Sequence, residues 1–169
     1  MTRRAVVQKW ILYSLCALAL VLVQSLLLVR VQVWGVHPFL LPAIDVIPVT
    51  LERDEGALLF SVFFGLACDL LTPVAGLPCF YALAFLVSGG LAWLLSGRVV
   101  AAGLVCSLAA AASALVVCGV LHLAVLAGSQ SVDVTAAAVL AGKEAALSLP
   151  LTVLVHYPFR RICLLTQRD

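Results

Sequence analysis

The chain has 169 residues, of which 64% are hydrophobic and 11% are charged, and its formal net charge is +2. An ordinary soluble domain is about 45–50% apolar and about 25% charged, so this chain has too little polar surface for a water-soluble globule. The small and dispersed positive charge also argues against nucleic acid as a partner. The composition therefore predicts an integral membrane protein with one transmembrane domain over residues 1–169.

Apolar runs of the length that a bilayer requires recur along the whole chain. A membrane-spanning helix needs about 20 mainly apolar residues, with a range of about 17–25. This criterion predicts an all-α fold with six transmembrane helices, at residues 10–30, 38–51, 56–72, 77–96, 99–127 and 135–157. The first run follows an Arg-rich start, as in a signal peptide. It is too long for one and lacks a small-residue cleavage site, so we expect a retained span.

The second predicted span is short and is interrupted by Pro42, Asp45 and Pro48. It could be a kinked helix, a half-helix or a re-entrant segment, because proline removes backbone hydrogen bonds that lipid cannot replace. The distribution of positive charge decides whether it crosses. Six crossings place eight of the ten Lys and Arg residues on one side with both termini, one (Arg30) on the other, and Lys143 inside a span. The positive-inside rule then makes both termini cytoplasmic.

The fifth predicted span carries a row of small residues at helical spacing: Gly103, Ser107 and Ala111. Such rows let two helix backbones approach closely. The row could pack inside the bundle or could contact another membrane protein. The six cysteines have no metal-site spacing, and we expect them to act as small hydrophobic side chains.

Four ionisable residues fall inside predicted spans: Asp45, Asp69, Lys143 and Glu144. A charge in the bilayer core costs at least about 2.5 kcal/mol, so each is expected to have a partner or a task. Counted along the helices, all four lie in the outer half. They could form one polar cluster, with Lys143 bridging to Asp45 or Asp69. Lys143 and Glu144 are neighbours and cannot share a helix face.

Three roles remain open for this cluster. It could be a structural ion pair that fixes helix register, a contact to a partner's polar group, or part of a proton or substrate path. Catalysis has little support, because His37, His122 and His156 lie in different segments without metal-ligand spacing, and no nucleophile motif occurs. We therefore expect no catalytic residue, no metal and no cofactor.

A longer pattern resembles a known family. After a basic first span and Pro38, the chain reads Gly65-Leu-x-x-Asp69-Leu-Leu, then an outer turn ending in Gly76, a span with a central Gly89, and a closing Arg160-Arg161. This pattern resembles the MreD family of bacterial rod shape-determining proteins, with Gly65, Asp69 and Gly76 at signature positions. Ser61 stands where the family often has glycine, and the turn after Asp69 is one residue shorter than usual.

The resemblance implies a non-enzymatic, six-helix scaffold or regulator of the cell-elongation complex in the bacterial inner membrane. Its fold would be similar to the substrate-binding subunits of energy-coupling-factor transporters. It would bind MreC, and associate with RodA, a class B penicillin-binding protein, MreB and membrane lipids. The alternative is a vitamin-binding transporter subunit. Such subunits typically carry Ala-x-x-x-Ala on the first helix, whereas Val21 and Val23 follow Ala17 and Ala19 here. An intramembrane enzyme lacks a recognisable nucleophile–base pair.

Overall fold

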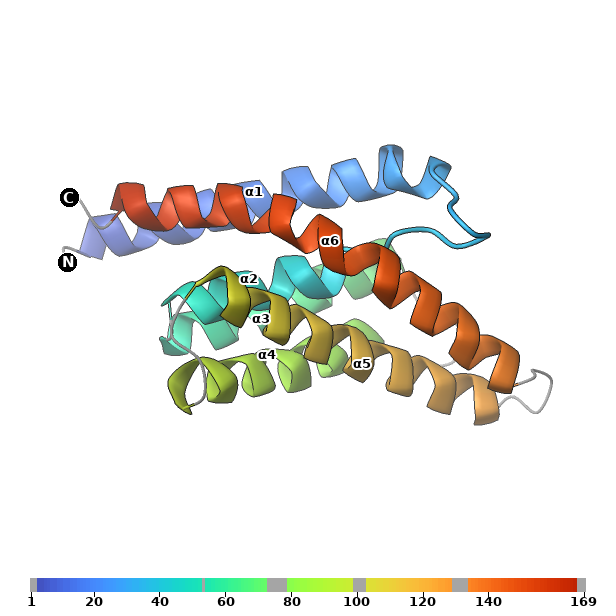
Figure 1. Ribbon diagram of the computed structural model, residues 1–169. Coiled ribbons are helices and arrows are strands. Elements are labelled where there is room, and N and C mark those ends of the chain that lie inside the picture. Colours follow the sequence, from blue (N-terminus) through green and yellow to red (C-terminus); the bar gives the residue numbers. More distant parts are fainter. Residues whose placement is uncertain (1–2, 53, 73–78, 99–102, 129–133, 167–169) are drawn as a thin grey trace.

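The computed structural model describes residues 3–52, 54–72, 79–98, 103–128 and 134–166, and the described chain is helical almost throughout (Figure 1). A short 3₁₀ turn, η1, covers Leu28–Arg30, and the α-helices have the following bounds. They are α1 (Arg3–Leu26), α2 (Leu41–Glu52), α3 (Glu55–Leu71), α4 (Phe80–Arg98), α5 (Leu104–Gly128) and α6 (Val134–Thr166). The prediction of an all-α fold is confirmed for these residues.

The helices match the predicted spans closely, with two extensions. Helix α1 begins at Arg3 rather than near residue 10, and α6 continues to Thr166 rather than ending near residue 157. Apolar runs mark only the part of a helix that fits a bilayer, and a helix can continue into the aqueous phase where its residues permit. Residues 77–78 and 99–102 of the predicted spans lie outside the described part of the chain.

Three helical stretches are long and apolar enough to cross a membrane: Val6–Arg30, Leu104–Gly128 and Thr135–Thr166. Phe80–Ser96 is apolar but shorter. Helix α2 has 12 residues, which corresponds to a length of about 18 Å at about 1.5 Å per residue. It is therefore too short to span a hydrocarbon core of about 30 Å by itself. The structure fits a membrane protein, and of the second predicted span (38–51) residues 41–51 are α-helical.

Helix α2 occupies the middle of the bundle (Figure 1). Every residue from Leu41 to Thr50 is buried, and α2 contacts α1, α3, α4, α5 and α6. Pro42 lies in the first turn, where a missing N–H costs nothing, and Pro48 lies inside the helix. The neighbouring helices shield this interrupted backbone from lipid.

The segment between η1 and α2 is not helical, and polar side chains of α1 and α6 form hydrogen bonds with its backbone. Gln24 of α1 donates to the Pro38 carbonyl over 2.7 Å and accepts from the Leu40 N–H over 3.2 Å. The Phe39 N–H donates to the Ser148 hydroxyl of α6 over 2.8 Å. Irregular backbone is tolerated within a membrane when protein groups form hydrogen bonds with its N–H and C=O groups. Gln24 and Ser148 supply these hydrogen bonds here.

The small residues of α5 face inward. Ser107, Ala111 and Ala114 are fully buried, and α5 packs closely against α2. Ser107 and Ala111 of this row therefore pack inside the bundle, whereas Gly103, which precedes α5, is only partly buried. The start of α1 and the end of α6 lie at the same end of the bundle, and the end of α5 and the start of α6 lie at the other (Figure 1).

Candidate functional site

The best-defined polar contact on α3 is made by Asp69. Its two carboxylate oxygens accept hydrogen bonds from the Tyr81 N–H at 2.8 Å and the Ala82 N–H at 2.9 Å. These N–H groups belong to the first turn of α4, where no carbonyl of the same helix can serve them. Asp69 therefore caps α4 from a different helix, and its negative charge meets the positive end of the helix dipole.

Gly65 lies one helical turn before Asp69 and acts on the same two residues. A Cβ added to Gly65 would lie 2.6 Å from Ala82 Cα and 2.8 Å from the Tyr81 carbonyl oxygen. Only glycine allows this backbone approach, and the approach brings the α4 N–H groups within reach of Asp69. We call Gly65, Asp69, Tyr81 and Ala82 the α3–α4 joint. Gly76, the third signature residue, lies outside the described residues.

A second close contact joins α3 and α4 further along. A Cβ added to Gly89 would lie 2.7 Å from Ser61 Oγ. The Ser61 side chain therefore occupies the space that a glycine at position 61 would leave empty beside Gly89. Ser88 donates a hydrogen bond to Asp45 Oδ2 over 3.2 Å, while Asp45 Oδ1 and Ser61 Oγ are buried without a partner among the described residues. Asp45 is thus a buried core carboxylate between α2 and α4.

Lys143 and Glu144 lie apart from these groups. Lys143 is exposed on α6, whereas Glu144 is half-buried. No ion pair joins Lys143 to Asp45 or Asp69 in the described part of the chain, so the possible bridge is not observed there. The depth of a residue along a helix axis fixes its height in the membrane but not the direction in which its side chain points. Asp69 and Asp45 each have other hydrogen-bond partners instead.

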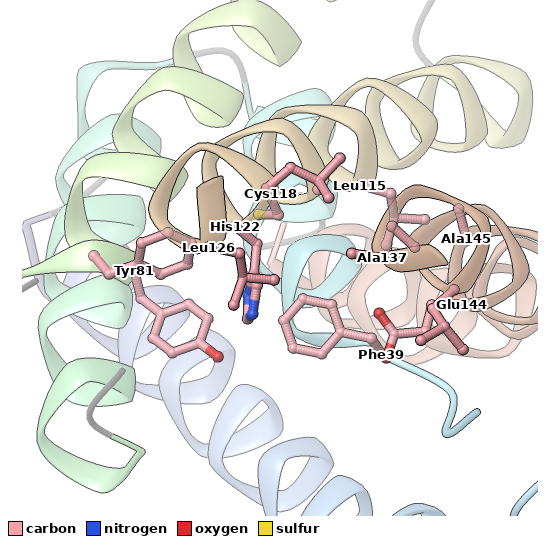
Figure 2. Close-up of a pocket in the computed structure, with 14 residues that line it drawn as sticks. Phe39, Tyr81, Leu115, Cys118, His122, Leu126, Ala137, Glu144 and Ala145 are labelled. Carbon is pink, nitrogen blue, oxygen red and sulfur yellow. The ribbon is translucent and has the colours of Figure 1, made fainter. Parts of the chain in front are cut away.

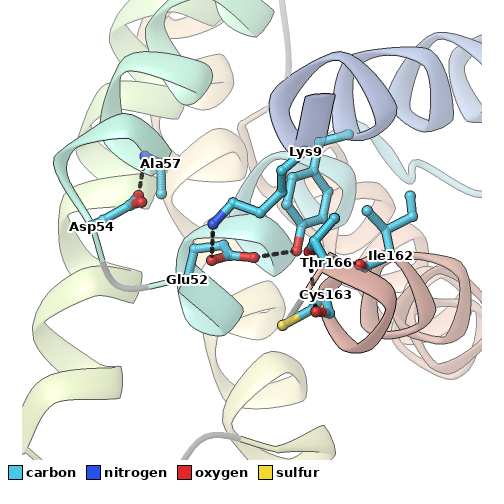
Figure 3. A network of polar contacts seen from close by, with 8 residues as sticks. Lys9, Glu52, Asp54, Ala57, Ile162, Cys163 and Thr166 are labelled. Atoms are coloured by element: carbon cyan, nitrogen blue, oxygen red, sulfur yellow. Dashed lines mark hydrogen bonds and ion pairs between the residues drawn. The ribbon is translucent and has the colours of Figure 1, made fainter. Parts of the chain in front are cut away.

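The ion pair found among the described residues joins Lys9 of α1 to Glu52 of α2, with 2.5 Å between Lys9 Nζ and Glu52 Oε2 (Figure 3). The Tyr13 hydroxyl donates to Glu52 Oε1 over 2.6 Å. Tyr13 also stacks on Phe159 of α6. The network connects three helices, and Lys9 and Tyr13 are buried. From the sequence, Lys9 was one of the eight positive charges on the side of the termini; its pairing was not predictable because Glu52 lies 43 positions away.

Another unexpected contact is buried in the core. Ser107 Oγ lies 3.0 Å from His156 Nδ1 and 3.0 Å from Thr50 Oγ1. A serine beside a histidine can serve as nucleophile and base, an arrangement that the sequence did not suggest. Here all three side chains are at most 1% exposed, so a substrate cannot reach them. The contact binds α2, α5 and α6 together.

Two of the cavities among the described residues lie beside functional candidates. The first has a volume of about 230 Å³ and lies between α5, α6, the start of α4 and Phe39. Figure 2 shows His122 and Glu144 lining it, with the Phe39 ring between them. The second has a volume of about 180 Å³ and forms an apolar groove between α1 and α3, lined by Leu18, Phe63 and other apolar residues.

Metal chemistry finds no support in the described residues, which contain no group of three or more His, Cys, Asp or Glu side chains that could hold an ion. The embedded polar residues instead join helices or line a cavity. Comparisons with family models, with curated proteins and with solved structures found no match to this chain.

Proposed function

We propose that this protein is a non-enzymatic membrane scaffold of the bacterial cell-elongation complex and that it binds MreC. It would lie in the inner membrane with six crossings and both termini in the cytoplasm. RodA, a class B penicillin-binding protein and MreB would join the same assembly. The proposal rests on the resemblance to the MreD family and on the use that the fold makes of the residues that carry it.

The α3–α4 joint is the observation that supports the proposal most strongly. Gly65 and Asp69, two residues of the signature, both act on Tyr81 and Ala82 at the start of α4. A Gly-x-x-x-Asp spacing places both residues on one face of α3. Gly65 allows the backbone of α4 to approach α3, and Asp69 caps the first turn of α4. The signature thus corresponds to one structural task, which is to fix the outer ends of α3 and α4.

The available surface also suits a scaffold. Large apolar side chains project from α1 and α3 beside the apolar groove, with Leu18 52%, Phe63 68% and Leu70 86% exposed. In a bilayer, such faces contact lipid or a neighbouring transmembrane helix. A single-span partner such as MreC can bind there through side-chain packing alone.

The alternative is a vitamin-binding subunit of an energy-coupling-factor transporter. The cavity beside Glu144 is the specific feature that favours it, because it combines aromatic walls with polar groups. Its volume of about 230 Å³ is, however, smaller than the about 300–1,000 Å³ of typical small-molecule sites. We therefore rank this alternative second.

Depletion of the protein in its native bacterium tests the proposed function. The proposal expects cells to lose their rod shape and become round while division continues, and expects an intact copy to restore rods. Unchanged cell shape after complete depletion would contradict it. Loss of vitamin uptake with normal cell shape would support the transporter alternative instead.

A further inference from the structure

The cavity between α5 and α6 contains a carboxylate, that of Glu144, and no Lys or Arg is among the residues that line the cavity. Glu144 is half-buried and lies ten residues after the start of α6 at Val134. No hydrogen bond or ion pair to its carboxylate is found among the described residues, where the ion pair present is Lys9–Glu52. A lone charge at this depth of a membrane helix is costly and calls for a partner.

The other groups around the cavity define what that partner must be. Its walls include the rings of Phe39, Phe80 and Tyr81, and no Lys or Arg lines it. His122 also lines it, and His122 and His37 lie close enough to interact electrostatically with Glu144. Among the side chains that line the cavity, Glu144 supplies the carboxylate and no Lys or Arg opposes it. Aromatic faces beside a carboxylate favour a cation.

The size of the cavity limits how much of a molecule it can hold. A volume of about 230 Å³ is below the about 300–1,000 Å³ that enclose a drug-sized ligand. The cavity can hold a small polar head and the first carbons of a chain. The rest of such a molecule would lie outside, along exposed apolar side chains such as Leu140 of α6. This division fits an amphiphile better than a fully enclosed solute.

We infer that the α5–α6 cavity binds the protonated primary amine of a membrane amphiphile, with the Glu144 carboxylate as its acceptor and the surrounding rings enclosing the head. The ammonium group donates to Glu144, and the aromatic faces of Phe39 and Tyr81 exclude water from the contact. The source of the amine can be an aminophospholipid or a single-chain amine. This inference is independent of the proposed role in cell elongation.

Binding to the full-length protein in detergent, measured by native mass spectrometry, tests the inference. The probes are phosphatidylethanolamine against phosphatidylglycerol, and dodecylamine against dodecanol. Wild-type protein should prefer at least one of the amines over its amine-free counterpart by about tenfold, the effect of one charge-assisted hydrogen bond. Preference for phosphatidylethanolamine alone identifies a lipid head group; preference for dodecylamine alone identifies a single-chain amine.

Two substitutions and a matched control complete the experiment. Glu144→Gln should abolish the preference, whereas Lys143→Gln, a charge removed from the adjacent exposed position, should leave it unchanged. Ala137→Leu narrows the cavity while keeping the carboxylate, and should weaken binding of the amine even if Glu144→Gln fails to fold. Equal binding of all four probes to the wild type, or a preference that survives both Glu144→Gln and Ala137→Leu, would overturn the inference.

Discussion

Asp69 of α3 caps the start of α4. It supplies acceptors to two N–H groups of the first turn of α4, at 2.8 and 2.9 Å. Loss of a capping side chain typically costs about 0.5–2 kcal/mol, and an unsatisfied polar group that is shielded from water costs about 1–3 kcal/mol. The cost belongs at the upper end of these ranges, because two N–H groups lose their acceptor at once.

Asp69→Ala should therefore lower stability by about 2 kcal/mol, and Asp69→Asn, which keeps one acceptor oxygen, should lose less. Leu70→Ala is the matched control, because Leu70 is the next residue and is 86% exposed. Thermal unfolding in detergent, followed by size-exclusion chromatography of the remaining folded fraction, measures all three. Equal melting temperatures for Asp69→Ala and Leu70→Ala would contradict the capping role.

The Lys9–Glu52 pair gives a second prediction at this scale. Both side chains are less than 10% exposed, at 6% and 9%, and breaking a buried pair by removing one partner costs about 3–5 kcal/mol. Lys9→Met should be strongly destabilising because it leaves the Glu52 charge with Tyr13 alone. The double variant Lys9→Met/Glu52→Gln should recover most of the loss. A double-mutant cycle of melting temperatures checks this, and additive losses would show that the two residues do not interact.

Side-chain direction and tertiary pairing explain which site residues could be predicted from the sequence. The apolar runs around Asp45 and Asp69 predicted that both residues are embedded. The sequence did not predict their partners, Ser88 and the α4 backbone, because these contacts depend on how the helices are rotated against one another. For the same reason the possible bridge from Lys143 is not observed and the buried role of Lys9 was missed.

Helices α3 and α4 are held together by close backbone approach as well as by the cap. A methyl group at Gly65 would meet backbone atoms of Ala82 and Tyr81 at 2.6 and 2.8 Å, whereas one at Gly90 would meet no atom within 4 Å. Both glycines lie inside helices. In a helix interior, alanine is favoured over glycine by about 1 kcal/mol, so the two sites should respond in opposite directions.

Gly65→Ala should be destabilising by about 1–3 kcal/mol, the usual cost of overpacking, and Gly90→Ala should be neutral or stabilising. Melting temperatures of the two variants in the same detergent give the comparison. If Gly65→Ala were as stable as Gly90→Ala, the close approach at the α3–α4 joint would be wrong.

At the level of elements, the apolar runs predicted the number and order of helices well, because a bilayer imposes a narrow range of lengths. The position of α2 was not predictable. Its two prolines and Asp45 suggested an irregular span, but the sequence did not indicate that five helices surround it. That arrangement is decided by packing, with Ser107 and Ala111 of α5 allowing close contact.

For the whole molecule, the proposed topology predicts which cysteine a reagent can reach from outside the cell. Cys79 is exposed just before α4, Cys16 is half-buried, and the other four cysteines are buried. With cytoplasmic termini and six crossings, Cys79 lies on the outer side. A membrane-impermeant maleimide should therefore label intact cells through Cys79, and Cys79→Ser should abolish the labelling.

A cysteine on the opposite side provides the control. Glu55 is exposed at the start of α3, so Glu55→Cys in the Cys79→Ser background should react only after the inner membrane is permeabilised. The proposed orientation would be reversed if the Glu55→Cys variant were labelled in intact cells while Cys79 of the wild type was not.

The proposed binding to MreC can be measured by co-purification of MreC from the same genome with the tagged, full-length protein in mild detergent. We expect stoichiometric MreC with the wild type and with Gly90→Ala, a several-fold lower ratio with Asp69→Ala, and partial recovery with Asp69→Asn. If the wild type retained no more MreC than an unrelated six-helix membrane protein does, the proposed scaffold role would be wrong.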